Sequence, residues 1–354
     1  MNDITQMLIN SATKIMKDTC TKELINEAER GNWSTALWAT LKEAGMITVA
    51  IPEELGGNGG SVTDALHILR LAGKYSAPIP LAETFLVNWL LANLNQQVSD
   101  EPISFALPYD NESFLFDKRD NGWVISGQAS FVPWARYVKR ILVFGQTNSQ
   151  HVVALLSRED GKIITGQNLA GEARDTVVYE HRLVRDCQVI PVSLQNVKKQ
   201  LWYGGAVARI VLMAGALDRV LEQTLAYSLE RSQFGRPIHR FQAIQHQIAL
   251  LAGEVAAAGV ACEYAVKAYE DGLLSKEIAM AKIRINEAAG LAAAISHQVH
   301  GAIGFTYEHS LHHSTRRLWA WRDEFGTERV WGERLSPDLI EIGRDGLWTY
   351  LTGR

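Results

Sequence analysis

Residues 230–237 read ERSQFGRP, and the regions on both sides of this segment predict long helices. Residues 205–231 contain no proline and show apolar side chains at helical spacing. Residues 241–272 and 275–301 follow, and both are rich in alanine, which suits close packing between helices. The region 198–354 is therefore predicted to form a helical bundle.

Upstream of the bundle, residues 101–197 have a different pattern. The stretches GWVISGQASFV (122–132), YVKRILVFG (137–145) and HVVALLSR (151–158) are short and rich in β-branched and aromatic residues. Close turns such as DNG and EDGK separate the stretches. This pattern predicts an antiparallel sheet or a small barrel.

The first hundred residues again show helical periodicity, for example in TALWATLKEAGMI (35–47) and SVTDALHILRLAGKYS (61–76). A glycine-rich stretch at 51–60 ends any helix, and Ser61 can cap the next one. The order of helices, strands and helices predicts an α+β protein with domains at 1–100, 101–197 and 198–354.

Composition narrows the classes of partner. Hydrophobic residues make up 47% of the 354 residues, charged residues make up 21%, and the formal net charge is −4, so nucleic acid is not expected. No uninterrupted apolar run reaches the ~18–20 residues needed to cross a bilayer, and the N-terminus does not resemble a signal peptide. Cys20, Cys187 and Cys262 lie far apart, which favours reduced thiols in a cytoplasmic protein.

Five segments resemble the acyl-CoA dehydrogenase family, in the family's order and at compatible spacing along nearly the whole chain. ERSQFGRP, with Phe241 and Gln242 after it, is similar to the family's Arg-x-x-Phe-Gly signature. The other four segments are IPEELGGNGG (51–60), GWVISGQASF (122–131), QVHGAIGFTYE (298–308) and the Gly326–Thr327 pair. Each segment alone is weak, but their joint order and spacing are specific.

The resemblance implies an N-terminal helical domain, a middle β domain and a C-terminal four-helix bundle. It also implies that FAD lies between the β domain and the bundle and reaches a neighbouring subunit. The implied reaction is α,β-desaturation of an acyl-CoA thioester, with electrons passing to an electron-transfer flavoprotein. The protein is expected to be a homo-oligomer or a hetero-oligomer with a related chain.

Seven residues are assigned to the cofactor through the resemblance. Arg231 can form a forked contact with the diphosphate, Gln233 offers amide donors, and Phe234 offers an apolar surface. Gln298 and Gly301 would let a second chain approach the cofactor closely, because glycine has no Cβ.

The last two of these residues lie near the flavin and the diphosphate. Thr327 can donate its hydroxyl to the diphosphate, and Phe131 can cover a face of the isoalloxazine. The flavin-facing stretches depart from the family, since 106–110 reads ALPYD where Thr-Glu-Pro is usual. Pro133 replaces a threonine and has neither a hydroxyl nor an N–H.

The family's catalytic glutamate is missing from its expected place. The residue before the Gly-Thr pair is Phe325, preceded by Asp323 and Glu324, and the family's second location for a base corresponds to Gly205. The small residues at 204–206 would leave room there for a bulky group. A carboxylate must take the α-proton in this reaction, so its absence bears directly on function.

Three hypotheses remain open. In the first, the loop shifts by one residue and Glu324 is the base, with Asp323 behind it. In the second, this chain is the glutamate-lacking subunit of a heteromeric enzyme and completes the FAD site of its partner. In the third, the fold has another activity or none.

The histidines at 297, 300, 309, 312 and 313 are close in sequence. They do not show a repeated metal-ligand spacing, so they are interpreted as polar surface or interface residues and no metal is expected.

Overall fold

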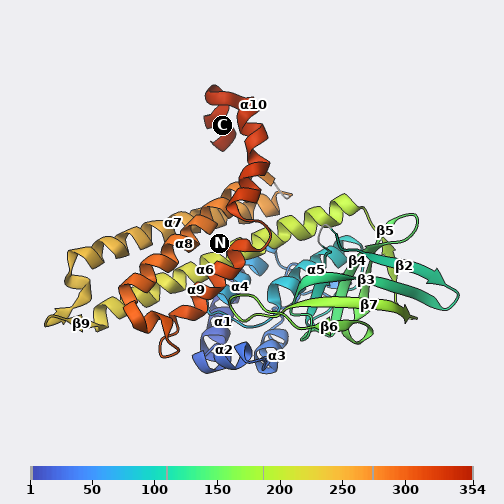
Figure 1. Ribbon diagram of the computed structural model, residues 1–354, viewed down its shortest axis with the longest axis horizontal. Coiled ribbons are helices and arrows are strands. Elements are labelled where there is room, and N and C mark those ends of the chain that lie inside the picture. The colour runs from blue at the N-terminus through green and yellow to red at the C-terminus, as the bar shows by residue number, and fades with distance from the viewer. Residues whose placement is uncertain (1–2, 109–110, 186, 273–274, 353–354) are drawn as a thin grey trace.

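The computed structural model describes residues 3–108, 111–185, 187–272 and 275–352. Helices come first, then a sheet, then long helices (Figure 1), as the sequence predicts. Ser61 caps α4, because its hydroxyl accepts from the Asp64 N–H at 3.1 Å while the Asp64 carboxylate accepts from the Ser61 N–H at 2.9 Å. The N-terminal elements are α1 (Asp3–Thr19), α2 (Lys22–Glu29), α3 (Thr35–Glu43), η1 (Glu53–Leu55), α4 (Val62–Lys74) and α5 (Leu81–Asn93).

The middle domain is one sheet in the order β6-β7-β3-β2-β4-β5-β8, with β1 beside β4. Most pairs are antiparallel as predicted, but β4 is parallel to both β1 and β2, so the sheet is mixed. The β2–β3 hairpin separates these strands in sequence, and the chain returns to run in the same direction as β2. The strands are β1 (Ile103–Ala106), β2 (Phe114–Arg119), β3 (Gly122–Pro133), β4 (Arg140–Gln146), β5 (His151–Ser157), β6 (Lys162–Ile164), β7 (Arg174–Val184) and β8 (Val189–Pro191), with the short helix η2 (Arg158–Asp160) after β5.

The C-terminal region is built on α6, which packs against α4, α7, α8 and α9. Glycines let α4 and α6 approach closely, since a Cβ on Gly73 would lie 2.0 Å from the Leu212 carbonyl oxygen and one on Gly215 would lie 1.9 Å from that of Arg70. The elements are α6 (Leu194–Glu230), β9 (Ser232–Gln233), β10 (Arg236–Pro237), η3 (Ile238–Arg240), α7 (Gln242–Glu270), α8 (Ser275–His300), η4 (Gly301–Phe305), α9 (Leu311–Asp323) and α10 (Glu328–Thr352).

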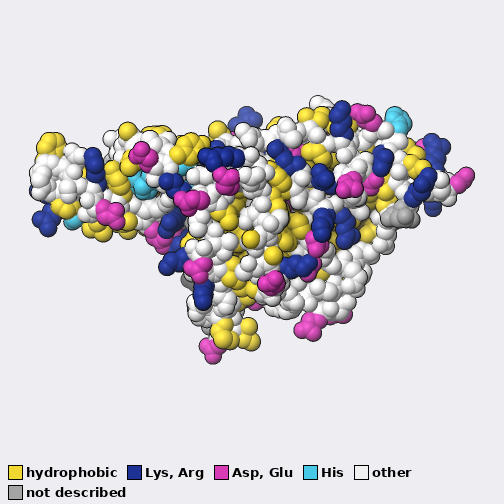
Figure 2. Space-filling view, turned by 90° about the horizontal axis from the view of Figure 1, so that it is seen from below, with side chains coloured by type: hydrophobic (Ala, Val, Ile, Leu, Met, Phe, Trp, Pro, Cys, Tyr) yellow, Lys and Arg dark blue, Asp and Glu magenta, His cyan; other side chains and the backbone are white. Residues whose placement is uncertain are grey.

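Two ends of the bundle differ in their surroundings. The end that carries β9 and η4 extends as a narrow arm beyond the rest of the molecule (Figures 1 and 2), whereas the other end lies against α5 and the sheet. Near that second end α10 projects from the body, and Gly343 (φ 64°) breaks it into two segments. α7 is long and apolar enough to cross a membrane by length and composition, and only 28% of its apolar window is buried.

Candidate functional site

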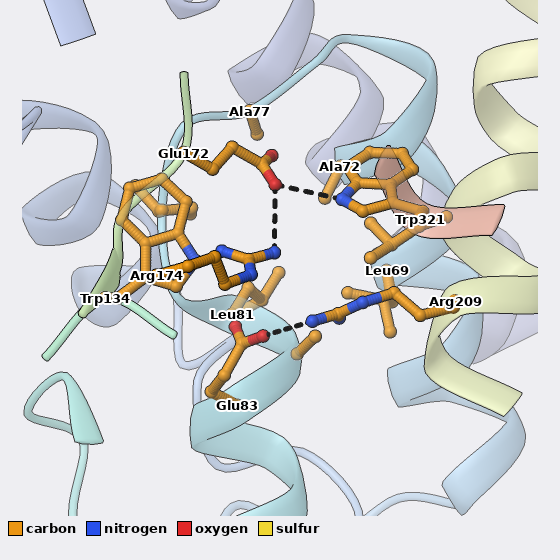
Figure 3. Close-up of a pocket in the computed structure, with 13 residues that line it drawn as sticks. Leu69, Ala72, Ala77, Leu81, Glu83, Trp134, Glu172, Arg174, Arg209 and Trp321 are labelled. Carbon is orange, nitrogen blue, oxygen red and sulfur yellow. Dashed lines mark hydrogen bonds and ion pairs between the residues drawn. The ribbon is translucent and has the colours of Figure 1, made fainter. Parts of the chain in front are cut away.

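The three domains meet around a set of buried ion pairs, part of which is drawn in Figure 3. Glu324 follows α9, and its carboxylate oxygens lie 2.6 Å from Nη2 of Arg174 and 2.5 Å from Nε of Arg209. Arg209 also reaches Glu83 at 2.7 Å, and Arg174 reaches Glu172 at 3.1 Å. Since Arg174 lies on β7, Arg209 on α6 and Glu83 on α5, these contacts join all three domains.

The electrostatics of this network fix the charge on Glu324. Burial alone would raise the pKa of its carboxyl group, but the charges and hydrogen bonds of Arg174 and Arg209 outweigh burial and lower the pKa to about 2. Both carboxylate oxygens are engaged by guanidinium groups. Glu324 is therefore an anion near neutral pH and has little tendency to accept a proton there.

Phe325 occupies the position expected for the family's base and packs against the second expected position. A Cβ added to Gly205 would lie 2.3 Å from Cε1 of the Phe325 ring. The ring also lies 6.1 Å from Trp202 and 6.3 Å from Phe105, measured between centroids. The room left by the small residues at 204–206 is thus filled by a side chain of the protein itself, which corrects the expectation that a bulky group could enter there.

The loop that carries Glu324 and Phe325 is held in register from α8. Lys282 Nζ donates to the carbonyl oxygen of Arg322 at 3.0 Å, and Asn286 Nδ2 donates to the same carbonyl at 3.1 Å. Trp331 Nε1 donates to the Phe325 carbonyl at 3.0 Å. Burial lowers the pKa of Lys282 to about 7, although nearby acidic groups oppose the shift. These bonds oppose a one-residue shift of the loop.

Little open space remains at the junction. The cavity there has a volume of about 20 Å³, close to what one water molecule requires. It is surrounded by Glu83, Glu172, Arg174 and Arg209 together with aliphatic and indole side chains (Figure 3). This cavity cannot hold an acyl chain.

Three of the other residues assigned from the sequence also lie on this side of the molecule. Asp323 is exposed at the end of α9. Thr327 immediately precedes α10, and its hydroxyl accepts from the Val330 N–H at 3.4 Å. Phe131 on β3 is 64% exposed. Of the stretch at 106–110 that replaces the family's Thr-Glu-Pro, positions 109 and 110 lie outside the described residues.

A second cluster of assigned residues lies at the far end of the bundle. Arg231 ends α6, and Gln233 belongs to the β9–β10 hairpin, whose two-residue turn is Phe234–Gly235. Both turn residues have positive φ, 51° and 75°, which glycine tolerates and phenylalanine does not favour. The Phe234 side chain is nevertheless 93% exposed. An exposed aromatic ring on a strained turn is typical of a residue that contacts something outside its own chain.

Gln298 and Gly301 lie at the same end of the bundle. Gln298 is exposed on the last turn of α8, and a Cβ on Gly301 would meet nothing within 4 Å. Tyr227, one turn before Arg231, ties the two segments together: its hydroxyl donates to the His300 carbonyl at 3.2 Å, and the two rings stack at 4.4 Å.

The structure therefore separates the assigned cofactor residues into two groups. Phe325 contacts α6 at Gly205, and Arg231 lies 26 residues further along this helix, so about 39 Å separates the two ends. Thr327 lies with Phe325, and Arg231 lies with Gln298. One chain cannot bring Thr327 and Arg231 to the same diphosphate.

The histidines near η4 are largely buried, which corrects their interpretation as polar surface residues. His297, His300, His312 and His313 are each less than a tenth exposed. Stacking explains their burial, since the His297 ring lies 4.1 Å from Phe305. Among the residues that the structure describes, no group of three or more His, Cys, Asp or Glu side chains could hold a metal ion.

Two family models match the chain. The model of the acyl-CoA dehydrogenase N-terminal domain matches residues 2–101, and that of the C-terminal domain matches residues 200–334. The chain belongs to the acyl-CoA dehydrogenase family. The predicted family is confirmed, and with it the FAD-dependent oxidation of acyl-CoA thioesters as the class of reaction.

Named relatives agree with this acyl-CoA dehydrogenase assignment, and a solved structure shares the fold. Acyl-CoA dehydrogenase IpdE2 of Mycolicibacterium smegmatis is 26% identical over 349 residues, which cover 96% of this chain and all of the relative. Acyl-CoA dehydrogenase FadE27 of Mycobacterium tuberculosis is 25% identical over a region that covers 92% of this chain and 94% of the FadE27 chain. A chain of the ChsE4-ChsE5 complex from Mycobacterium tuberculosis superposes with a TM-score of 0.87 at 22% identity, covering 97% of this chain and 99% of that one.

The buried ion-pair network in this acyl-CoA dehydrogenase was not anticipated from the sequence. Its signal was single charges inside apolar helical stretches, namely Glu83 in LAETFLVNWLL and Arg209 in AVARIVLMAG. A charged residue in such a stretch is rarely buried unless it is paired. The partners of these residues are distant in sequence and could be identified only from the structure.

Proposed function

We propose that this chain is the base-lacking subunit of a heteromeric FAD-dependent acyl-CoA dehydrogenase. In this assembly the end of its bundle that carries β9 and η4 completes a FAD site. The other half of that site, including the catalytic carboxylate, belongs to a related chain. The contact between Phe325 and Gly205 carries the proposal, because it closes both positions at which the family places a base. The two arginines on Glu324 remove the nearest alternative carboxylate.

The residues at the bundle end fit a shared cofactor. The hydride acceptor of the family's reaction is FAD, whose diphosphate requires forked, permanently charged donors. Arg231 supplies such a donor, Gln233 and Gln298 supply amides, and Phe234 supplies an aromatic face. All four side chains are exposed, so a partner chain can reach them.

The surface next to this end suits a partner subunit. Leu250 and Val260 on α7 and Leu291 on α8 are exposed, and they belong to the same bundle as Phe234. A related chain covering this face would remove apolar surface from water. α7 also carries Glu254 and Glu263 within its apolar window, which favours a protein partner over lipid. A cytoplasmic location and electron transfer to an electron-transfer flavoprotein remain parts of the proposal.

Co-expression with related acyl-CoA dehydrogenase chains tests the proposal. The expected result is a colourless chain when purified alone and a yellow complex, bleached by an acyl-CoA, with the correct partner. In that complex Arg231→Ala should lower flavin affinity about tenfold or more, because a charge-assisted contact is lost. Arg329→Ala, which removes an exposed arginine on α10, serves as the matched control.

Glu324→Gln separates the proposal from the hypothesis that this chain is self-sufficient. The rate of bleaching per bound flavin should be unchanged in the Glu324→Gln complex, even where the variant is less stable. A chain that is yellow alone, bleaches with an acyl-CoA and loses bleaching through Glu324→Gln would overturn the proposal. A yellow chain that no acyl-CoA bleaches, alone or with any partner, would favour a flavoprotein of another function.

A further inference from the structure

A second cavity, lined by none of the residues assigned to the cofactor, has a volume of about 400 Å³. It lies where α2, the loop between β6 and β7, and the segment from η4 to α9 come together. Sites for small molecules typically have volumes of about 300–1,000 Å³. Its lining is polar and consists of Asn26, Glu29, Arg30, Gln167, Gly171, Tyr307 and Arg316.

The lining offers hydrogen-bond donors that the protein does not use. Asn26 Oδ1 accepts from His313 Nε2 at 2.8 Å, which leaves the amide nitrogen of Asn26 available. Within the parts of the chain that the structure describes, no protein group bonds to that nitrogen, to the Gln167 side chain or to the Tyr307 hydroxyl. A ligand rich in acceptor oxygens would satisfy these donors.

The charges around the cavity favour an anion. Its lining carries two guanidinium groups, Arg30 and Arg316, against one carboxylate, Glu29. Glu29 lies 2.9 Å from Arg316 and 3.5 Å from Arg317, which itself does not line the cavity. Arg30 is paired with Glu27, but both side chains are about half exposed or more, and exposed pairs of this kind are weak. The guanidinium of Arg30 can therefore turn from Glu27 to a bound anion.

The wall formed by the β6–β7 loop is held rigidly. Asn168 Oδ1 accepts from the N–H groups of Ala170 at 3.0 Å and Glu172 at 3.1 Å. Arg316 Nε donates to the Leu169 carbonyl at 2.8 Å. Since side-chain bonds fix this wall, a ligand would lose little free energy in ordering the β6–β7 loop.

We propose that this cavity binds an organic phosphate of nucleotide size. The phosphate would pair with Arg30 and Arg316, and the ring of Tyr307, which is 65% exposed, would stack on a flat heterocycle. None of the bundle-end residues assigned to FAD lines this cavity. Binding here is thus independent of the proposed shared flavin site.

Calorimetric titration of the purified chain tests the site with four probes: AMP, adenosine, inorganic phosphate and CoA. AMP should bind, adenosine should not bind because it lacks the phosphate, and inorganic phosphate should bind more weakly than AMP because it lacks the ring. CoA also carries a phosphorylated adenosine, and it should bind if that part of CoA is the natural ligand of the cavity. Weaker binding of CoA than of AMP would identify a free nucleotide as that ligand.

Variants locate the site. Arg30→Ala and Tyr307→Ala should each lower the affinity for AMP about tenfold, whereas Tyr307→Phe should keep the stacking contribution and lose less. Arg329→Ala is the control, because it removes an equally exposed arginine that is also paired within its helix. Absence of AMP binding, or binding that is unchanged in both alanine variants, would overturn the proposal. Neither outcome depends on whether the chain shares a flavin.

Discussion

At the scale of single residues, the contact between Phe325 and Gly205 decides what this chain can do. The aromatic ring needs a glycine on α6, because a Cβ there would lie 2.3 Å from it. A carboxylate at position 325 would instead be placed beside Arg209, whose guanidinium carbon lies 5.3 Å from the Phe325 ring centroid. The absence of a carboxylate at position 325 and the filling of the space at Gly205 are therefore linked in the structure.

Gly205→Ala should destabilise the protein by about 1–3 kcal/mol, because the new methyl group overpacks against Phe325. In a Phe325→Ala background the same change should cost much less, because the ring is gone. A double-mutant cycle from urea unfolding measures this coupling. Additive effects of the two substitutions would show that the contact does not constrain α6.

At the scale of elements, buried imidazoles support η4 and the end of α8. Burial is the main reason that the pKa of His300 falls to about 4, although its bond to the Ser296 carbonyl opposes the shift. A histidine with a lowered folded pKa stabilises the fold fully above its unfolded value of 6.5. This stability is lost as pH falls from 6.5 towards 4, because the unfolded chain binds the proton first.

Acidification from pH 7 to pH 5 should cost about 2 kcal/mol of unfolding free energy through His300. His300→Gln should remove this part of the pH dependence, and the exposed His246→Gln should not. Urea unfolding at the two pH values provides the measurement. Equal slopes in wild type and His300→Gln would show that another group titrates.

Other elements show how much of the fold could be predicted from the sequence. Glycine and serine positions near residue 60 predicted the cap at Ser61, because such caps depend on neighbouring residues only. The resemblance assigned Arg231 and Gln298 to the cofactor, but their position at one end of the bundle is a finding of the structure. The parallel pairing of β4 and the burial of the histidines depend on contacts between distant segments, which a periodic pattern does not encode.

At the scale of the whole molecule, ion pairs join the three domains into one unit. Glu83 comes from the N-terminal helices, Arg174 from the sheet, and Arg209 and Glu324 from the C-terminal region. Removing one partner of such a buried set leaves charges without compensation, which is costly. The network therefore couples domain packing to the loop that carries Phe325.

Arg209→Met should lower the unfolding free energy by about 3–5 kcal/mol at pH 7, because it leaves Glu83 and Glu324 without their shared cation. Arg219→Met, a half-buried site on the same helix whose arginine makes only a partly exposed ion pair, should change it by only about 0.5 kcal/mol. The gap between Arg209→Met and wild type should narrow below pH 4.5. In the wild type, the ionised Glu324 carboxylate stabilises the fold, and this stabilisation is lost as pH falls from 4.5, the ordinary pKa of the group, towards its folded pKa of about 2. The variant lacks part of this stabilisation at every pH, because Arg209 is gone. A gap that stays constant down to pH 3 would contradict this account.

The roughly 39 Å that separates the two groups of cofactor residues sets a stoichiometry. In a homomeric enzyme of this fold every chain offers both halves, so cofactors and chains are equal in number. Under the function proposed above, this chain offers only the far half, because Phe325 fills its own junction, and its partner offers the complementary one. An assembly of equal numbers of the two chains then holds one flavin for every two polypeptides, whatever its total size.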